Sequence, residues 1–132
     1  MKIAPDTVPS SIEQAVEALV AAFDEQDRQV IRDGEPLYHF TCGMHVRNAW
    51  SLWQKDSPIV RDAIQKYGIA HGDDVSGLIF AWAFAKVRGQ TFDPALQVEE
   101  YRKHWAKEGL TPLQAGGAEP RPAKARTGRA SG

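Results

Sequence analysis

Apolar residues recur every three or four positions along much of the chain, the spacing that places them on one face of an α-helix. The pattern begins in residues 10–23 (SSIEQAVEALVAAF), where Ser10 and Glu13 stand at the spacing of an N-terminal capping box. A second, shorter helix is expected over residues 25–33, ending at Gly34, a residue suited to a left-handed cap. No segment alternates convincingly as a strand does, so the pattern predicts helices throughout.

A third helix is expected over residues 39–53 (HFTCGMHVRNAWSLW), after an extended linker at Pro36. Ser57 and Pro58 then give a typical start for a fourth helix, because serine caps free N–H groups and proline fits the first turn. This fourth helix is expected to end at Tyr67, just before a glycine.

The fifth helix, expected over residues 73–88, differs from the others because its apolar residues point in all directions. A helix that is apolar all round has neighbours on several sides, so this one is predicted to lie at the centre. A sixth helix follows Asp93, with a proline in its first turn. The sequence thus predicts an all-α fold, a compact single domain of about six helices around the central one, spanning residues 1–111.

Composition changes abruptly after this domain. Residues 112–132 (PLQAGGAEPRPAKARTGRASG) contain four Lys or Arg and a single acid, whereas residues 1–111 carry 12 Lys or Arg against 16 Asp or Glu. The C-terminal segment has no aromatic residue and too little apolar surface to offset the entropy of ordering, so it is predicted to be a disordered, basic tail rich in Gly, Pro and Ala. It serves either as a solubilising tail or as a weak electrostatic arm for anionic partners.

The sequence also bears on where the protein works. No stretch approaches the roughly 18–20 uncharged apolar residues of a membrane span. The first ten residues hold one Lys and no long apolar run, so no signal peptide is expected. Cys42 is the single cysteine, which excludes an internal disulfide and a multi-cysteine zinc site. A cytoplasmic location is the expectation.

Two polar residues interrupt the apolar face of the third expected helix. On a helical wheel, Arg47 and His39 fall inside an arc of mainly apolar positions, namely Phe40, Gly43, Met44, Val46, Trp50 and Trp53. Arginine stays charged at any ordinary pH, and a buried, unpaired guanidinium would cost several kcal/mol. At least one carboxylate must therefore meet Arg47. We expect it to be Asp73 or Asp74, at the start of the central helix, with His39 and His71 close by.

These residues resemble a family of small bacterial proteins with no assigned activity, classed as a domain of unknown function. The shared pattern reads His-Phe-x-x-Gly-Met-x-x-Arg-Asn-x-Trp-x-Leu-Trp, then His-x-Asp-Asp-x-Ser, then Gln-x-x-x-Tyr-x-x-x-Trp. Its three parts begin here at His39, His71 and Gln97, and the resemblance spans about residues 10–106. It implies a bacterial origin and a helical fold, and it implies no reaction.

The first function that fits these residues is a non-catalytic binding or interaction module, of a regulatory or toxin-neutralising type. In this hypothesis the charged cluster fixes helix packing, and exposed aromatic residues such as Trp53 and Trp105 anchor another protein. Nucleic acid is a weaker partner hypothesis, because the domain is acidic and only the tail is basic. The sequence predicts neither the ligand nor the oligomeric state.

The alternative is a site for a phosphate- or nucleotide-like small molecule, or a metal-assisted enzyme. In that site, Arg47 and Asn48 would hold an anion. Other polar side chains would move protons or bind a divalent metal, and these candidates are His39, His71, Asp73 and Asp74. The spacing of the last three matches no established metal motif, so no cofactor is expected. Asp73 also has a simpler role, as the N-cap of the central helix.

Overall fold

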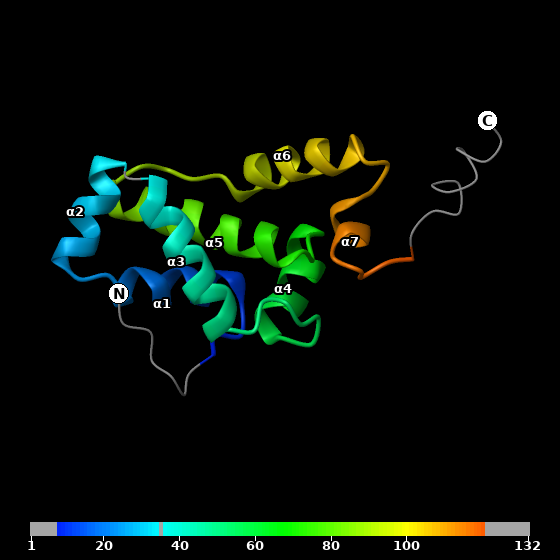
Figure 1. The fold of residues 1–132 in the computed structure, drawn as a ribbon, viewed down its shortest axis with the longest axis horizontal. Coiled ribbons are helices and arrows are strands. Elements are labelled where there is room, and N and C mark those ends of the chain that lie inside the picture. The colour runs from blue at the N-terminus through cyan, green and yellow to red at the C-terminus, as the bar shows by residue number, and fades with distance from the viewer. Residues whose placement is uncertain (1–7, 35, 121–132) are drawn as a thin grey trace.

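The computed structural model describes residues 8–34 and 36–120, and the side chains of residues 36–42 lie outside this description. The described residues form helices and no strands, as the apolar pattern predicts. Figure 1 shows the seven helices of the described part: α1 (Ile12–Ala22), α2 (Glu25–Asp33), α3 (Pro36–Ala49), α4 (Pro58–Tyr67), α5 (Gly72–Val87), α6 (Pro94–Ala106) and α7 (Pro112–Ala115).

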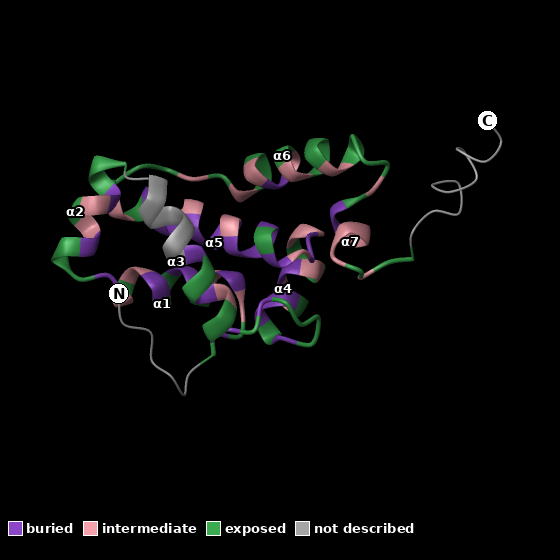
Figure 2. Cartoon of the chain, viewed as in Figure 1, coloured by how far each residue is buried: buried purple, intermediate pink, exposed green. Residues whose placement is uncertain are grey.

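Helix α5 lies at the centre of the fold, as its apolar sequence predicts. It packs against α1, α2, α3, α4 and α6, and Figure 2 shows that most of its length is buried. The fully buried core residues that α5 contributes include Val75, Leu78, Ile79 and Phe80. Among the described residues, no helix has the length and apolarity needed to cross a bilayer. The predicted all-α fold around a central apolar helix is therefore confirmed.

Helix α1 begins one residue later than the predicted capping box. Its N-cap is Ser11, whose hydroxyl accepts a hydrogen bond from the backbone N–H of Gln14 at 3.1 Å. Ser10 instead donates its backbone N–H and its hydroxyl to the Gln14 side chain. Glu13 takes no part in the cap, which leaves its carboxylate available to α4.

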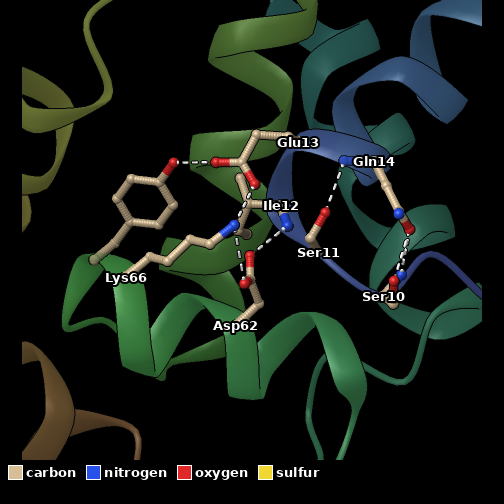
Figure 3. Close-up of polar contacts among 8 residues, drawn as sticks. Ser10, Ser11, Ile12, Glu13, Gln14, Asp62 and Lys66 are labelled. Carbon is tan, nitrogen blue, oxygen red and sulfur yellow. Dashed lines mark hydrogen bonds and ion pairs between the residues drawn. The ribbon is translucent and has the colours of Figure 1, made fainter.

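Polar contacts join α1 to α4, as Figure 3 shows. Asp62 accepts a hydrogen bond from the backbone N–H of Ile12 at 2.8 Å, so a residue of α4 caps the first turn of α1. Lys66 lies between two carboxylates, 2.8 Å from Glu13 and 3.2 Å from Asp62. Tyr67 donates its hydroxyl to the other oxygen of Glu13 at 2.5 Å. This α1–α4 polar cluster was not predicted, because its partners are far apart in the sequence.

The boundaries predicted for α2 are confirmed. Asp24 and Asp27 form a capping box at its start, and Gly34 ends it in the left-handed conformation. Arg88, which follows α5, donates two hydrogen bonds from its guanidinium to the carbonyl of Ile31, at 3.0 and 2.7 Å. A cation therefore caps the C-terminal end of α2, where the helix dipole favours positive charge.

Helix α3 differs from its prediction at both ends. It starts at Pro36, which is the first helical residue and not an extended linker. It ends at Ala49, because Ser51 adopts the left-handed conformation, with φ of 55°, and the N–H of Leu52 turns back to the carbonyl of Arg47. Trp53 therefore lies in the turn after α3, and the helical wheel placed it wrongly.

The chain stays ordered beyond the predicted domain boundary at residue 111. Thr111 caps α7, and Pro112 is buried. After α7, the chain packs closely on the loop that precedes α5, since a Cβ at Gly116 would lie 2.5 Å from that of Ala70. The rest of the predicted tail, residues 121–132, lies outside the described residues.

Candidate functional site

Arg47 projects from the last turn of α3 onto the start of α5. Its side chain is 16% exposed, and its Nε lies 3.7 Å from a carboxylate oxygen of Asp73. One terminal nitrogen donates to the hydroxyl of Ser76 at 3.2 Å. A Cβ at Gly43 would lie 3.0 Å from this nitrogen, so the glycine makes room for the guanidinium. The expected ion pair with the acids that open α5 thus forms, with Asp73 as the partner.

The guanidinium of Arg47 is neutralised but not fully hydrogen-bonded. Its Nε is buried without a hydrogen-bond partner, because the 3.7 Å to Asp73 suits an ion pair and is too long for a hydrogen bond. The guanidinium carbon also lies 5.3 Å from the ring centroid of Trp53, within the range of a cation–π contact. The carboxylate of Asp73 and the ring of Trp53 therefore both stabilise the positive charge of Arg47.

Asp74 faces a different partner. Its carboxylate accepts a hydrogen bond from the indole N–H of Trp105, in α6, at 2.8 Å, and Asp74 is only 6% exposed. Burial raises the pKa of Asp74 above its ordinary value, although the hydrogen bond from Trp105 and the nearby His71 and His104 act in the opposite direction. The two adjacent acids therefore divide their roles, since Asp73 pairs with Arg47 and Asp74 holds α6.

His71, and not Asp73, is the N-cap of α5. Its Nδ1 accepts a hydrogen bond from the backbone N–H of Asp73 at 3.1 Å, and the helix begins at Gly72. The same Nδ1 lies 3.8 Å from the Asp73 carboxylate. The prediction that Asp73 is the N-cap of α5 is thus wrong. The Asp73 carboxylate is 62% exposed.

Aromatic rings surround this corner of the molecule. The imidazole of His71 lies between two indoles, 6.2 Å from the centroid of Trp53 and 5.4 Å from that of Trp105. Trp53 is 56% exposed, yet its ring lies against the backbone of α5, since a Cβ at Gly72 would be 2.6 Å from Cε3 of the indole. We call Trp53, His71, Asp73 and Trp105 together the Trp53 surface.

The structure does not bring every predicted site residue into this surface. Asn48 is exposed on α3, and the side chain of His39 lies outside the described residues. Met44, expected on the apolar face of α3, is 47% exposed. Within the described part of the chain, no group of three or more His, Cys, Asp or Glu residues is arranged to hold a metal ion.

Sequence reasoning missed two contributors to the site. Trp105 was expected only as an exposed anchor, and its bond to Asp74 was not foreseen because it joins α6 to the start of α5. Ser76 was noted only in the family pattern, although it stands one turn after Asp73 and so shares its helix face. That spacing was the available signal for a hydroxyl beside Arg47.

The chain matches a known protein family. Residues 8–86 match the family described as a domain of unknown function, DUF6794. The matched region contains Arg47, Trp53 and the acids of α5, and it ends before α6, so Trp105 lies beyond it. Searches of curated proteins and of solved structures found no match. Since the match covers more than half of the chain, the protein belongs to the DUF6794 family of domains of unknown function.

Proposed function

We propose that this protein is a non-catalytic binding module that engages another protein through the Trp53 surface. The observation that carries the proposal is the state of Trp53, a large apolar side chain that is 56% exposed while its ring lies against Gly72 and Arg47. Tryptophan is among the residue types that contribute most to protein–protein binding. A side chain already held in place also loses less conformational entropy when a partner binds.

The backbone that presents Trp53 supports the same proposal. Ser51 has a positive φ of 55°, a conformation that is unfavourable for residues other than glycine. Such strained residues cluster at binding and catalytic sites, where the surrounding structure maintains them. Here the strained residue ends α3 and precedes the exposed indole by two positions.

Arg47 favours a binding module over the anion-binding alternative. Its Nε is buried, one terminal nitrogen donates to Ser76, and the Asp73 carboxylate lies within ion-pair distance. An anion approaching Arg47 would meet a charge that Asp73 already neutralises. The regulatory or toxin-neutralising role expected from the sequence stays a prediction.

The test is affinity capture from cells of the source organism, with the captured proteins quantified by mass spectrometry. Trp53→Ala should reduce capture of a specific partner at least tenfold, since loss of a central aromatic anchor costs about 2 kcal/mol or more. The matched control is Leu96→Ala, because Leu96 is a 68% exposed apolar residue of α6 outside the Trp53 surface. Equal capture by both folded variants would show that the Trp53 surface is not the binding site.

A further inference from the structure

Helices α6 and α7 are attached to the rest of the fold differently from the other helices. Helix α5 packs against α1, α2, α3 and α4, whereas α6 packs mainly on α5 and α7 (Figure 1). Ten of the 16 residues of α5 are buried, but Val98 is the single buried residue among the 13 of α6. Local stability is low where few apolar side chains are buried. Helix α6 is therefore expected to separate from α5 more easily than α1 does.

Two aromatic side chains hold α6 on α5. Trp105 donates from its indole to the carboxylate of Asp74 at 2.8 Å. The hydroxyl of Tyr101 occupies the space left by Gly77, where a Cβ would lie 2.5 Å away. When α6 leaves α5, water hydrates the charge of Asp74, which burial disfavours in the closed position. Opening therefore costs less than the loss of the Trp105 hydrogen bond alone would suggest.

The chain between α5 and α6 is suited to act as a hinge. Arg88 is fixed, because its guanidinium donates two hydrogen bonds to the carbonyl of Ile31 in α2. The next three residues, 89–91, are exposed, and no described atom lies within 4 Å of the position of a Cβ on Gly89. Hinges are a few loop residues that absorb changes in φ and ψ, and an unpacked glycine does so readily. Helix α6 can thus move without disturbing α5.

Helix α7 belongs to the same moving part, because it packs on α6. A hydrogen bond of 2.6 Å from Lys55 to the carbonyl of Gly117 joins the chain after α7 to the turn after α3. This bond is exposed, so water can replace it when the two parts separate. We call residues 92–120 the C-terminal arm. The arm lies wholly beyond residues 8–86, the region that matches the family.

We propose that the C-terminal arm opens and closes about residues 89–91 while α1–α5 stay folded, and that only the closed arm completes the Trp53 surface. The arm supplies Trp105, whereas Trp53, His71 and Asp73 precede the hinge. This inference rests on the proposed function and adds its regulation. A partner that contacts Trp53 and Trp105 together binds the closed state alone, so its apparent affinity falls with the fraction of open molecules. Partner binding in turn holds the arm closed.

Hydrogen exchange of the backbone N–H groups in the full chain tests the opening without any partner. In the wild type, residues 98–106 of α6 should exchange at least tenfold faster than the protected residues of α1 and α5. Ile12→Val gives the sharpest comparison, because Ile12 is a fully buried residue of α1 whose contacts survive arm opening and are lost only on complete unfolding. This variant should accelerate exchange in α1 and α5 about fivefold and leave α6 unchanged.

Val98→Asp perturbs the arm instead, because it places a charge beneath α6. Exchange in α6 should then be nearly unprotected, while α1 and α5 remain protected. If Val98→Asp removed the protection of α1 and α5 as well, or if Ile12→Val accelerated α6 as much as α1, the arm would open only when the whole protein unfolds. Either result would overturn the proposal.

Exchange and partner capture separate this inference from the proposed function. If Trp53→Ala abolishes capture while α6 exchanges only with the whole protein, the proposed function stands and the inference fails. If the arm opens but Trp53→Ala leaves capture unchanged, the hinge stands and the proposed function fails. When both hold, Val98→Asp captures several-fold less partner than Leu96→Ala, because Leu96 is an exposed residue of the same helix and its loss leaves the arm closed. Equal capture by these two variants would contradict the coupling between the arm and the Trp53 surface.

Discussion

Replacing Trp105 with phenylalanine removes the indole N–H that hydrogen-bonds Asp74 while retaining an aromatic ring on α6. In the wild type this bond is 2.8 Å long, and its acceptor is 6% exposed. Water cannot easily replace the lost donor at a carboxylate so deeply placed. The variant therefore leaves a buried charge with one fewer hydrogen bond.

The size of the effect follows from the charge on the acceptor. A hydrogen bond to a charged group contributes about 1.5–3 kcal/mol, so Trp105→Phe should lower the free energy of unfolding by about 2 kcal/mol near pH 7. Asp74→Asn alone should be neutral or stabilising, because asparagine still accepts from Trp105 and no charge is buried. In the Asp74→Asn background the same Trp105→Phe change removes a neutral hydrogen bond, which contributes about 1 kcal/mol.

Urea denaturation followed by circular dichroism on the four proteins of this double-mutant cycle gives the coupling energy, expected at about 1 kcal/mol. The pH dependence has a defined sign. Because burial raises the folded-state pKa of Asp74 above its ordinary 3.8, the stability that this group contributes is present at low pH and lost as pH rises through the folded-state pKa. The deficit of Trp105→Phe should therefore be largest above that pKa and should shrink as pH falls toward 3.8.

Two results would refute this reasoning. One is a coupling energy near zero, which would mean that the indole N–H and the carboxylate do not interact in solution. The other is a Trp105→Phe deficit that stays constant from pH 7 to acid, which would mean that the lost stability comes from ring packing alone.

Three further substitutions test other features. Gly72→Ala places a Cβ 2.6 Å from the ring of Trp53, so thermal unfolding should show a free energy of unfolding about 1–3 kcal/mol below that of the wild type. Unchanged stability would mean that the indole moves away without penalty. Hydrogen bonds from Lys66 and Tyr67 outweigh the effect of burial and hold the pKa of Glu13 below 4.5, so its stabilisation is present above pH 4.5 and lost on further acidification. Glu13→Gln should therefore lower the free energy of unfolding by less than about 1 kcal/mol at pH 7, as measured by urea denaturation. If acidification destabilised this variant as much as it destabilises the wild type, the reasoning would be contradicted. Ser51→Gly should raise the free energy of unfolding by up to about 1 kcal/mol, because glycine accepts the positive φ without strain. A lower free energy of unfolding in urea would show that the serine side chain is needed.

Several features of the fold were predictable because their causes are local. Asp24 and Gly34 determine the ends of α2 through their own side-chain and backbone chemistry, and Pro58 suits the first turn of α4. Ser57 is the N-cap of α4 but makes no side-chain cap, because its hydroxyl donates to the carbonyl of Trp50. The central position of α5 follows from apolar residues on all of its faces. The acid beside Arg47 was predictable for a different reason, since a cation on an apolar helix face must be neutralised wherever the helix packs.

The errors concern choices that tertiary structure decides. Sequence spacing cannot show which of the two adjacent acids pairs with Arg47. The choice depends on Trp105 of α6, which donates a hydrogen bond to Asp74 and leaves Asp73 to pair with Arg47. No glycine or proline marks the early end of α3 in the sequence. The helix ends because Ser51 adopts a left-handed conformation that is more usual for glycine. Histidine is an uncommon N-cap, so the role of His71 was assigned to Asp73, a residue type that caps helices more often.

The cap that Asp62 provides for Ile12 affects the order in which the chain can fold. Helix α1 has 11 residues, and an isolated helix of that length is marginal in water. Its first turn is completed by a carboxylate fifty positions later, which leaves the ribosome only after α2 and α3 have been made. During synthesis, the first turn of α1 therefore lacks this hydrogen bond until α4 has emerged, and α1 lacks its main packing partner until α5 has followed.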